Sequence, residues 1–111
     1  MSDKSDKARL EAIIEYIDDI DRIVARHETI ESALLDFEGE YALIMCIQQI
    51  GELVNKIESE KYTSFLPVKN IKGFHNIIAH QYDGINKQVA EMTIKKSIPE
   101  LRNIIIELLE K

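Results

Sequence analysis

The apolar residues of this chain recur with the period of an α-helix over almost its whole length. From Asp6 to about Arg26, leucine, isoleucine and valine follow i, i+3, i+4 and i+7 spacing, with charged residues between them. A second stretch, Glu40–Glu58, carries a heptad-like stripe of Leu43, Ile47, Ile50, Val54 and Ile57. No segment reads as a credible strand, and four Gly and two Pro are too few for the turns of an all-β chain. The spacing predicts an all-α fold, a helical bundle of about four to six helices with short connections.

In the first half of the chain, residues suited to helix ends divide this pattern. Thr29 is a suitable N-cap, because its hydroxyl can accept a hydrogen bond from a free backbone N–H, and it predicts a short helix at Ile30–Phe37. Gly39 then predicts a break before the helix at Glu40–Glu58. Cys46 lies beside the stripe of that helix, and we expect it to be a small core residue rather than a reactive thiol.

The second half divides in the same way. Residues 59–67 lose the helical period and end in proline, which predicts a loop leading to a helix near Val68–Ala79. The stretch His80–Gly84 is typical of a helix end and turn. Asn86 can cap a fifth helix and Ser97 a sixth, which tolerates a proline in its first turn. The apolar residues of these two helices are Val89, Met92 and Ile94, then Ile98, Leu101, Ile105 and Leu108.

The length and composition favour one domain in a reducing compartment. A chain of 111 residues fits a single compact domain, residues 1–111, and leaves no room for two independent cores. One cysteine excludes an internal disulfide and a Cys-based metal cluster. No apolar run approaches the roughly 20 residues that span a bilayer, and Met1–Lys7 is too polar for a signal peptide. We therefore expect a cytoplasmic protein with no membrane partner.

The charge of the chain is unevenly distributed. The formal net charge is −6, which by itself argues against a nucleic-acid partner. However, residues 1–60 hold 6 basic and 15 acidic side chains, whereas residues 61–96 hold 6 basic and 2 acidic ones. The basic third also contains two of the three histidines. A polyanion is expected to bind there first.

Two possible sites in the acidic half have simple structural explanations. Asp18, Asp19 and Asp21 could together hold a divalent metal, but on a helix Asp18 and Asp21 share a face while Asp19 points elsewhere. We expect a solvated face rather than a metal site. His27 follows Arg26 at a helix end, where a positive charge complements the helix dipole, and we expect it to cap that helix.

The segment Gly73–Tyr82 is denser in functional groups than any other part of the chain. On one helix Asn76 and His80 lie four residues apart and share a face, so the amide can fix the orientation and tautomer of the imidazole. His75 and His80 are five residues apart, about 140° around a helix axis, so one unbroken helix cannot point both at one ligand. Either the helix ends before His80, or two chains meet so that the histidine of one chain complements the histidine of its partner. Packing at a helix end would also explain these residues.

The same segment resembles the signature of the HepT-like toxins of the HEPN superfamily. Their motif is an arginine, four residues, a histidine, one residue and a tyrosine, often with an asparagine after the arginine and a glycine two residues before it. Gly73, Asn76, His80 and Tyr82 match in position and type, and the helices on either side fit the bundle of that family over nearly the whole chain. One position differs: His75 stands where the family has arginine. The sequence leaves open whether this is a natural variant or an attenuating change.

The resemblance implies a metal-independent endoribonuclease, the toxin of a type II toxin–antitoxin pair, with RNA as its substrate and no cofactor. It implies His80 as the general acid or base, Asn76 as its orienting residue and His75 at the phosphate-gripping position. An imidazole that is neutral at pH 7 has a shorter arm and fewer donors than a guanidinium, so we expect weaker phosphate binding. On the substrate side the implied residues are Tyr82, Lys69 and Lys72.

The resemblance also implies partners. One is a second copy of the chain, because these toxins are typically homodimers with both motifs lining one cleft. The other is an MntA-like minimal nucleotidyltransferase antitoxin, which in this family can transfer AMP to the motif tyrosine, here Tyr82. Two alternatives stay open: a noncatalytic HEPN-type module that binds a nucleotide or a protein, for which the missing arginine is the best argument, and a structural helical dimerisation protein.

Overall fold

The computed structural model describes residues 2–67, 71 and 87–110, and within these ranges the chain is helical with no strand, as predicted. The elements in chain order are α1 (Ser2–Arg26), α2 (Ile30–Leu35), α3 (Phe37–Lys56), α4 (Glu60–Thr63), α7 (Lys87–Met92), the π-helix η2 (Thr93–Ser97) and α8 (Ile98–Glu110). Among these, no helix is both long enough and apolar enough to cross a membrane.

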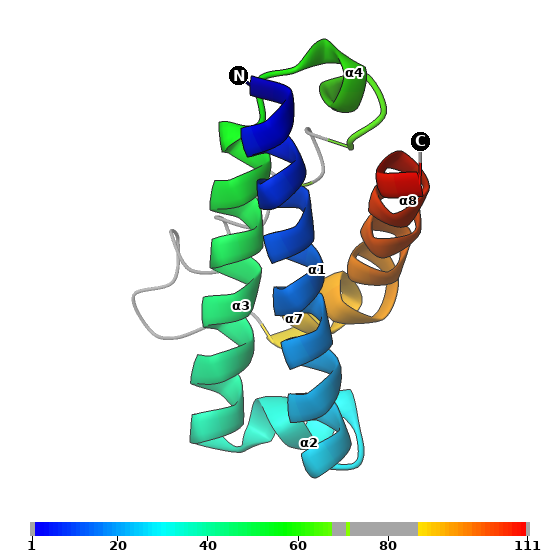
Figure 1. The fold of residues 1–111 in the computed structure, drawn as a ribbon. Coiled ribbons are helices and arrows are strands. Elements are labelled where there is room, and N and C mark those ends of the chain that lie inside the picture. The colour runs from blue at the N-terminus through cyan, green and yellow to red at the C-terminus, as the bar shows by residue number, and fades with distance from the viewer. Residues whose placement is uncertain (1, 68–70, 72–86, 111) are drawn as a thin grey trace.

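The two longest helices, α1 and α3, form an antiparallel pair at the centre of the fold (Figure 1). The short α2 closes one end of the pair, α4 lies at the other end, and α8 runs beside α1. Most of the apolar positions predicted from the helical period in α1, α3 and α8 are buried, although Ile14, Ile23 and Val24 of α1 are only partly so. In α1 the buried positions are Leu10, Ile13, Ile17 and Ile20, in α3 they are Leu43, Ile47, Ile50 and Val54, and in α8 they are Ile98, Leu101, Ile105 and Leu108.

The boundary between α2 and α3 lies at Asp36, and the predicted break at Gly39 is wrong. Thr29 caps α2 as predicted, with its hydroxyl accepting the Ser32 N–H at 3.0 Å, but α2 ends at Leu35. The carboxylate of Asp36 accepts the Gly39 N–H at 2.8 Å and so caps α3. Gly39 is buried in the first turn of α3, where an added Cβ would lie 2.4 Å from the Ala33 carbonyl oxygen. The glycine therefore allows α2 and α3 to approach closely rather than breaking a helix.

Two further predictions about element boundaries are wrong. The expected loop 59–67 contains the short helix α4, which buries Tyr62 against the core. Ser97 does not cap a separate helix, because the chain runs from α7 through η2 into α8, and the Ile98 N–H donates to the Thr93 carbonyl. Pro99 lacks an N–H, and its ring crowds the carbonyl four residues earlier. These two properties explain why the turn before it is widened into a π-helix.

The apolar residues of α7 are also only partly where the sequence suggested. Ile94 is buried, but Val89 and Met92 are exposed, and Ala90 and Thr93 take the inward positions instead. Thr93 satisfies its buried hydroxyl by donating to the Val89 carbonyl at 2.8 Å. Ala90, Thr93 and Ile94 follow i, i+3 and i+4 spacing, so they form one helical face, and Val89 and Met92 lie outside it.

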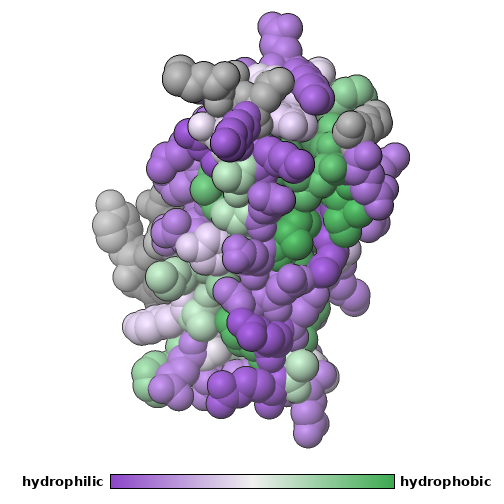
Figure 2. All heavy atoms as spheres, in the orientation of Figure 1, coloured by the Kyte–Doolittle hydropathy of each residue, from purple (hydrophilic) through white to green (hydrophobic). Residues whose placement is uncertain are grey.

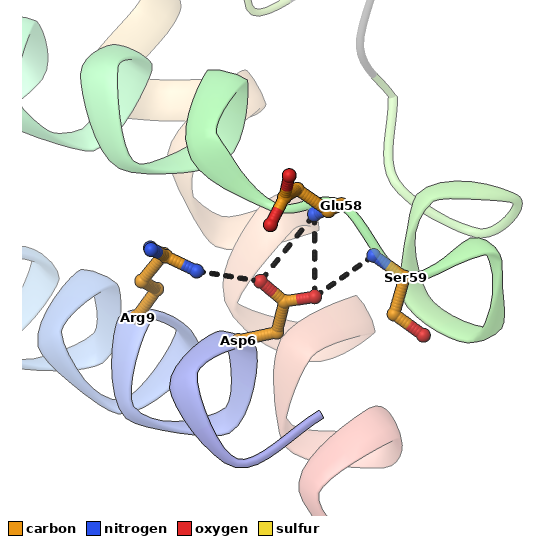
Figure 3. Close-up of polar contacts among 4 residues, drawn as sticks. All are labelled: Asp6, Arg9, Glu58 and Ser59. Atoms are coloured by element: carbon orange, nitrogen blue, oxygen red, sulfur yellow. Dashed lines mark hydrogen bonds and ion pairs between the residues drawn. The ribbon is translucent and has the colours of Figure 1, made fainter. Parts of the chain in front are cut away.

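The buried carboxylate of Asp6 joins the start of α1 to the connection between α3 and α4 (Figure 3). It accepts the Ser59 N–H at 2.8 Å and the Glu58 N–H at 3.2 Å, and Arg9 pairs with its other oxygen at 2.8 Å. These N–H groups lie just beyond the end of α3, where no helical partner is available. Asp6 is the only charged side chain among the buried core of the described residues, and its burial is compensated by these bonds.

We expect Asp6→Asn to lower the free energy of unfolding by about 2 kcal/mol or more, because an amide group would face backbone donors and leave Arg9 unpaired. Urea denaturation followed by circular dichroism measures this. Asp21→Asn is the matched control: Asp21 is 66% exposed and pairs at the surface, so its loss should cost less than about 1 kcal/mol. Equal effects of the two changes would contradict the structural role of Asp6.

Candidate functional site

The acidic run on α1 forms surface ion pairs. Arg102 of α8 reaches Asp18 at 2.7 Å and Asp21 at 2.9 Å, so these two carboxylates share a face as predicted. Asp19 pairs instead with Arg22 on another side of the helix. The described residues contain no group of three potential metal ligands. Asp18 and Asp21 thus connect α8 to α1, although each exposed pair contributes little to stability.

His27 links the end of α1 to the start of α3. Its Nδ1 donates to the Ile23 carbonyl at 2.8 Å, so the predicted capping role is confirmed. Its Nε2 lies 3.2 Å from a carboxylate oxygen of Asp36, the residue that caps α3. The bond to the Ile23 carbonyl, and next the bond to Asp36, raise the pKa of His27 above its ordinary value of 6.5. The protonated imidazole donates from both nitrogens, so the folded state favours it.

Cys46 is a core residue, as expected. It is buried within α3, and this burial raises the pKa of its thiol to about 11. At neutral pH the sulfur is therefore a thiol and not the nucleophilic thiolate.

The motif residues Gly73, His75, Asn76, His80 and Tyr82 lie outside the described residues, as do the predicted helix Val68–Ala79 except Ile71, the turn His80–Gly84 and the cap Asn86. Lys69 and Lys72 also lie outside them, so the assigned roles stay predictions.

The described residues on either side of the motif are anchored to the helical scaffold. Ile71 is 1% exposed, and its N–H donates to the Pro67 carbonyl at 3.1 Å. Lys87 begins α7, and its ammonium group lies 3.7 Å from the carboxylate of Glu40 on α3. The motif thus lies in the sequence between a residue of the core and a residue paired with α3.

Comparison with known proteins decides the family. The sequence pattern of the ribonuclease HepT-like family matches residues 13–108, which include the whole motif segment. The chain belongs to the HepT-like ribonuclease family. This assignment agrees with the all-α fold. The resemblance of the motif segment is one part of a match that extends along most of the chain.

Curated relatives of this HepT-like chain carry names of the same kind. It is 35% identical over 112 residues to the Methanocaldococcus jannaschii protein named "Putative RNase MJ0125", covering 95% of each chain. It is also 35% identical over 99 residues to "Putative RNase MJ1216" of the same organism, covering 86% of this chain and 80% of that one. "Putative RNase TTE0752" of Caldanaerobacter subterraneus subsp. tengcongensis is 35% identical over 72 residues, 63% of this chain and 64% of that one. No solved structure matches the chain significantly.

The sequence reasoning missed two features of this HepT-like chain that the structure reveals. One is the buried Asp6, which the sequence places on a polar position of α1 with no signal of its partners in the α3–α4 connection. The other is a row of exposed apolar side chains on α3, Phe37, Tyr41 and Met45. Their i, i+4, i+8 spacing, offset from the buried stripe, is a signal that could have identified them.

The raised pKa of His27 makes stability depend on pH in a defined direction. Because the folded-state pKa is higher than the unfolded value of about 6.5, the His27 contribution is fully present below that value and is lost as pH rises through the folded-state pKa. We expect the difference in unfolding free energy between wild type and His27→Gln to shrink from pH 5.5 to pH 8.5. Urea titrations at each pH measure it. A difference that grows with pH would contradict the proposed hydrogen bonding.

Proposed function

We propose that this chain is a cytoplasmic, metal-independent endoribonuclease that acts as the toxin of a toxin–antitoxin pair and cleaves RNA as a homodimer. Membership of the HepT-like ribonuclease family over residues 13–108 is the observation that carries the proposal. The four motif positions that match in type, including His80 and Tyr82, support it, and so do the relatives named as RNases.

Cleavage of RNA without a metal needs a group to take the ribose 2′-hydroxyl proton, a group to protonate the leaving 5′-oxygen, and positive charge on the phosphate. In our proposal His80 transfers the proton, because imidazole titrates near neutral pH. Asn76, four residues earlier, fixes the tautomer of that imidazole. Tyr82 donates a hydrogen bond to the phosphate, and Lys69 and Lys72 attract the RNA backbone.

The side chain at position 75 affects how tightly the enzyme is expected to bind the phosphate and how fast it cleaves. Guanidinium is always charged and grips a phosphate with two parallel donors, whereas imidazole is mostly neutral at pH 7 and offers one. We therefore propose a nuclease that is weaker than a relative with arginine at this position, and whose cleavage rises when His75 is protonated.

We expect His80→Ala to reduce cleavage of single-stranded RNA by about 100-fold or more, the usual contribution of a general acid or base. The rate is measured with excess EDTA, in which the wild-type activity should persist. His75→Arg should raise cleavage. His27→Gln is the matched histidine control and should leave the rate unchanged well below the melting temperature. Dependence on added magnesium, or full activity of His80→Ala, would refute the mechanism.

We further propose that an MntA-like nucleotidyltransferase inactivates the enzyme through Tyr82. The phenol oxygen attacks the α-phosphate of ATP, pyrophosphate leaves, and the phenol proton passes to solvent. The attached AMP adds negative charge and bulk where the RNA phosphate would bind, so repulsion and steric exclusion suffice to block cleavage.

After incubation with the cognate transferase and ATP, we expect peptide mass spectrometry to locate AMP on Tyr82 and cleavage to fall in parallel. Tyr82→Phe should take up no AMP. AMP found only on another residue, or on none while the enzyme is neutralised, would remove Tyr82 from the proposal.

One alternative has an observation in its favour. His75 at the arginine position fits a noncatalytic HEPN-type module that binds a nucleotide or a protein. It would be supported if wild type, His75→Arg and His80→Ala were all inactive yet one nucleotide or RNA bound tightly. Correct folding with no such binding would leave only a structural role.

A further inference from the structure

An ion pair joins α7, the first described helix after the motif segment, to α3. Lys87, the first residue of α7, places its ammonium group 3.7 Å from the carboxylate of Glu40 in the first turn of α3. The side chain of Glu40 is only 17% exposed, and that of Lys87 is 48% exposed. Water therefore screens this pair less than it screens an open surface pair, so each charge has more influence on the position of the other.

Glu40 is well fixed in the fold. Its backbone N–H donates to the Asp36 carbonyl at 2.8 Å, within the first turn of α3. The residues one turn further along the helix, Leu43 and Ile44, are buried in the core. The carboxylate of Glu40 is thus attached to the packed pair of α1 and α3, and it offers a fixed point to which another segment can be tied.

Apolar packing holds α7 only weakly. The helix has six residues and packs against α2, and only Ala90 among the six is buried. Alanine has a small apolar side chain, so its burial contributes little. Val89 and Met92 are 43% and 56% exposed, and the next large buried side chain is that of Ile94 in η2. The polar contact at the first residue of α7 therefore contributes a large share of what fixes the start of this helix.

The short distance along the chain connects this ion pair with the proposed catalytic residues. Tyr82 precedes Lys87 by five residues, and His80 precedes it by seven. An extended chain of five residues spans at most about 18 Å, so the position of Lys87 limits the space that Tyr82 can reach. The anchor on the other side of the motif, Ile71, is nine residues from His80. In sequence, Lys87 is therefore the nearer anchor for both residues.

We propose that Glu40 and Lys87 are positioning residues for the ribonuclease reaction: their ion pair fixes the end of the motif segment against α3 and thereby aligns His80 and Tyr82 with the RNA. This role rests on the proposed function, because neither residue has chemistry of its own in it. A general acid or base must lie within hydrogen-bond reach of the proton that it transfers, and a misplacement of about 1 Å can lower a rate about 100-fold. A modest tether can therefore affect the rate more than it affects the stability of the fold.

Direct binding of RNA by Lys87 is the competing interpretation, since Lys87 belongs to the basic segment 61–96. The two interpretations predict opposite results for Glu40→Gln. Loss of the carboxylate charge would free Lys87 for phosphate and strengthen RNA binding, whereas loss of a tether would slow cleavage. The half-buried partner favours the tether, because the ammonium group is already paired with Glu40.

We expect Glu40→Gln to lower kcat about threefold to tenfold while KM changes less than about twofold, because alignment matters most in the transition state. Lys87→Met should have the same effect, and Lys87→Arg, which keeps the charge, should cleave at close to the wild-type rate. The double variant Glu40→Gln/Lys87→Met should be no slower than either single variant, since both changes remove one contact. Unchanged or faster cleavage by Glu40→Gln, or additive losses in the double variant, would overturn the proposal.

Another ion pair between helices serves as the control. Figure 2 shows a face dominated by hydrophilic side chains, so an ion pair at the surface is not unusual in itself. Asp21 of α1 pairs with Arg102 of α8 at 2.9 Å, and Asp21→Asn should leave kcat unchanged. The urea midpoints of Glu40→Gln and Asp21→Asn should both stay within about 0.3 M of the wild-type value, because such pairs contribute little to stability. Equal slowing of cleavage by the two changes would overturn the positioning role.

Amide hydrogen exchange gives a measurement that does not need cleavage. In Glu40→Gln, exchange in the peptide from Tyr82 to Met92 should become faster, and in Asp21→Asn it should not. If the wild type cleaves RNA and Glu40→Gln cleaves it equally well, the positioning role is wrong and the nuclease stands. If the wild type cleaves nothing in EDTA yet exchange rises only in Glu40→Gln, the tether stands and the proposed chemistry fails.

Discussion

The packing of α1 against α3 is the interaction on which the rest of the structure depends. Each helix buries a continuous row of leucine, isoleucine or valine against the other, and α2, α4 and α8 are arranged around that pair. The residues that tie the ends of the pair are polar. At one end Asp6 holds the start of α1 to the chain beyond α3, and at the other His27 and Asp36 join the end of α1 to the start of α3. The apolar rows supply most of the stability, and the polar ends fix where the helices begin and end.

The sequence predicted the helical class and the buried rows because the 3.6-residue period of apolar residues can be recognised even when the exact ends of a helix are placed wrongly. It failed where a residue has two physical uses. Gly39 could be a helix break or a site of close approach, and only the position of the Ala33 carbonyl decides between them. Similarly, Ser97 could be a cap or an ordinary helical residue, and the wide turn before Pro99 decides this.

Long-range polar contacts were the least predictable features. The backbone N–H groups that Asp6 accepts from, those of Glu58 and Ser59, are more than 50 residues away along the chain, so no local sequence pattern indicates them. In contrast, the cap at Thr29 and the role of His27 at the end of α1 depend on neighbours within four residues, and both were predicted correctly. For the motif, the sequence supplied residue types and spacing, and the match over residues 13–108 supplied the family. The directions of the His80 and Tyr82 side chains depend on tertiary contacts that spacing alone does not determine.

The uneven charge of the chain bears directly on the proposed chemistry. The acidic residues belong mostly to α1, α2 and α3, and the excess of basic residues is found in the segment 61–96 that contains the motif. A phosphate chain approaching the molecule is therefore expected to be repelled by the surface of α1, α2 and α3 and attracted to the segment that contains the motif. This distribution of charge can direct RNA to the residues that are proposed to cleave it, although the net charge of the chain is −6.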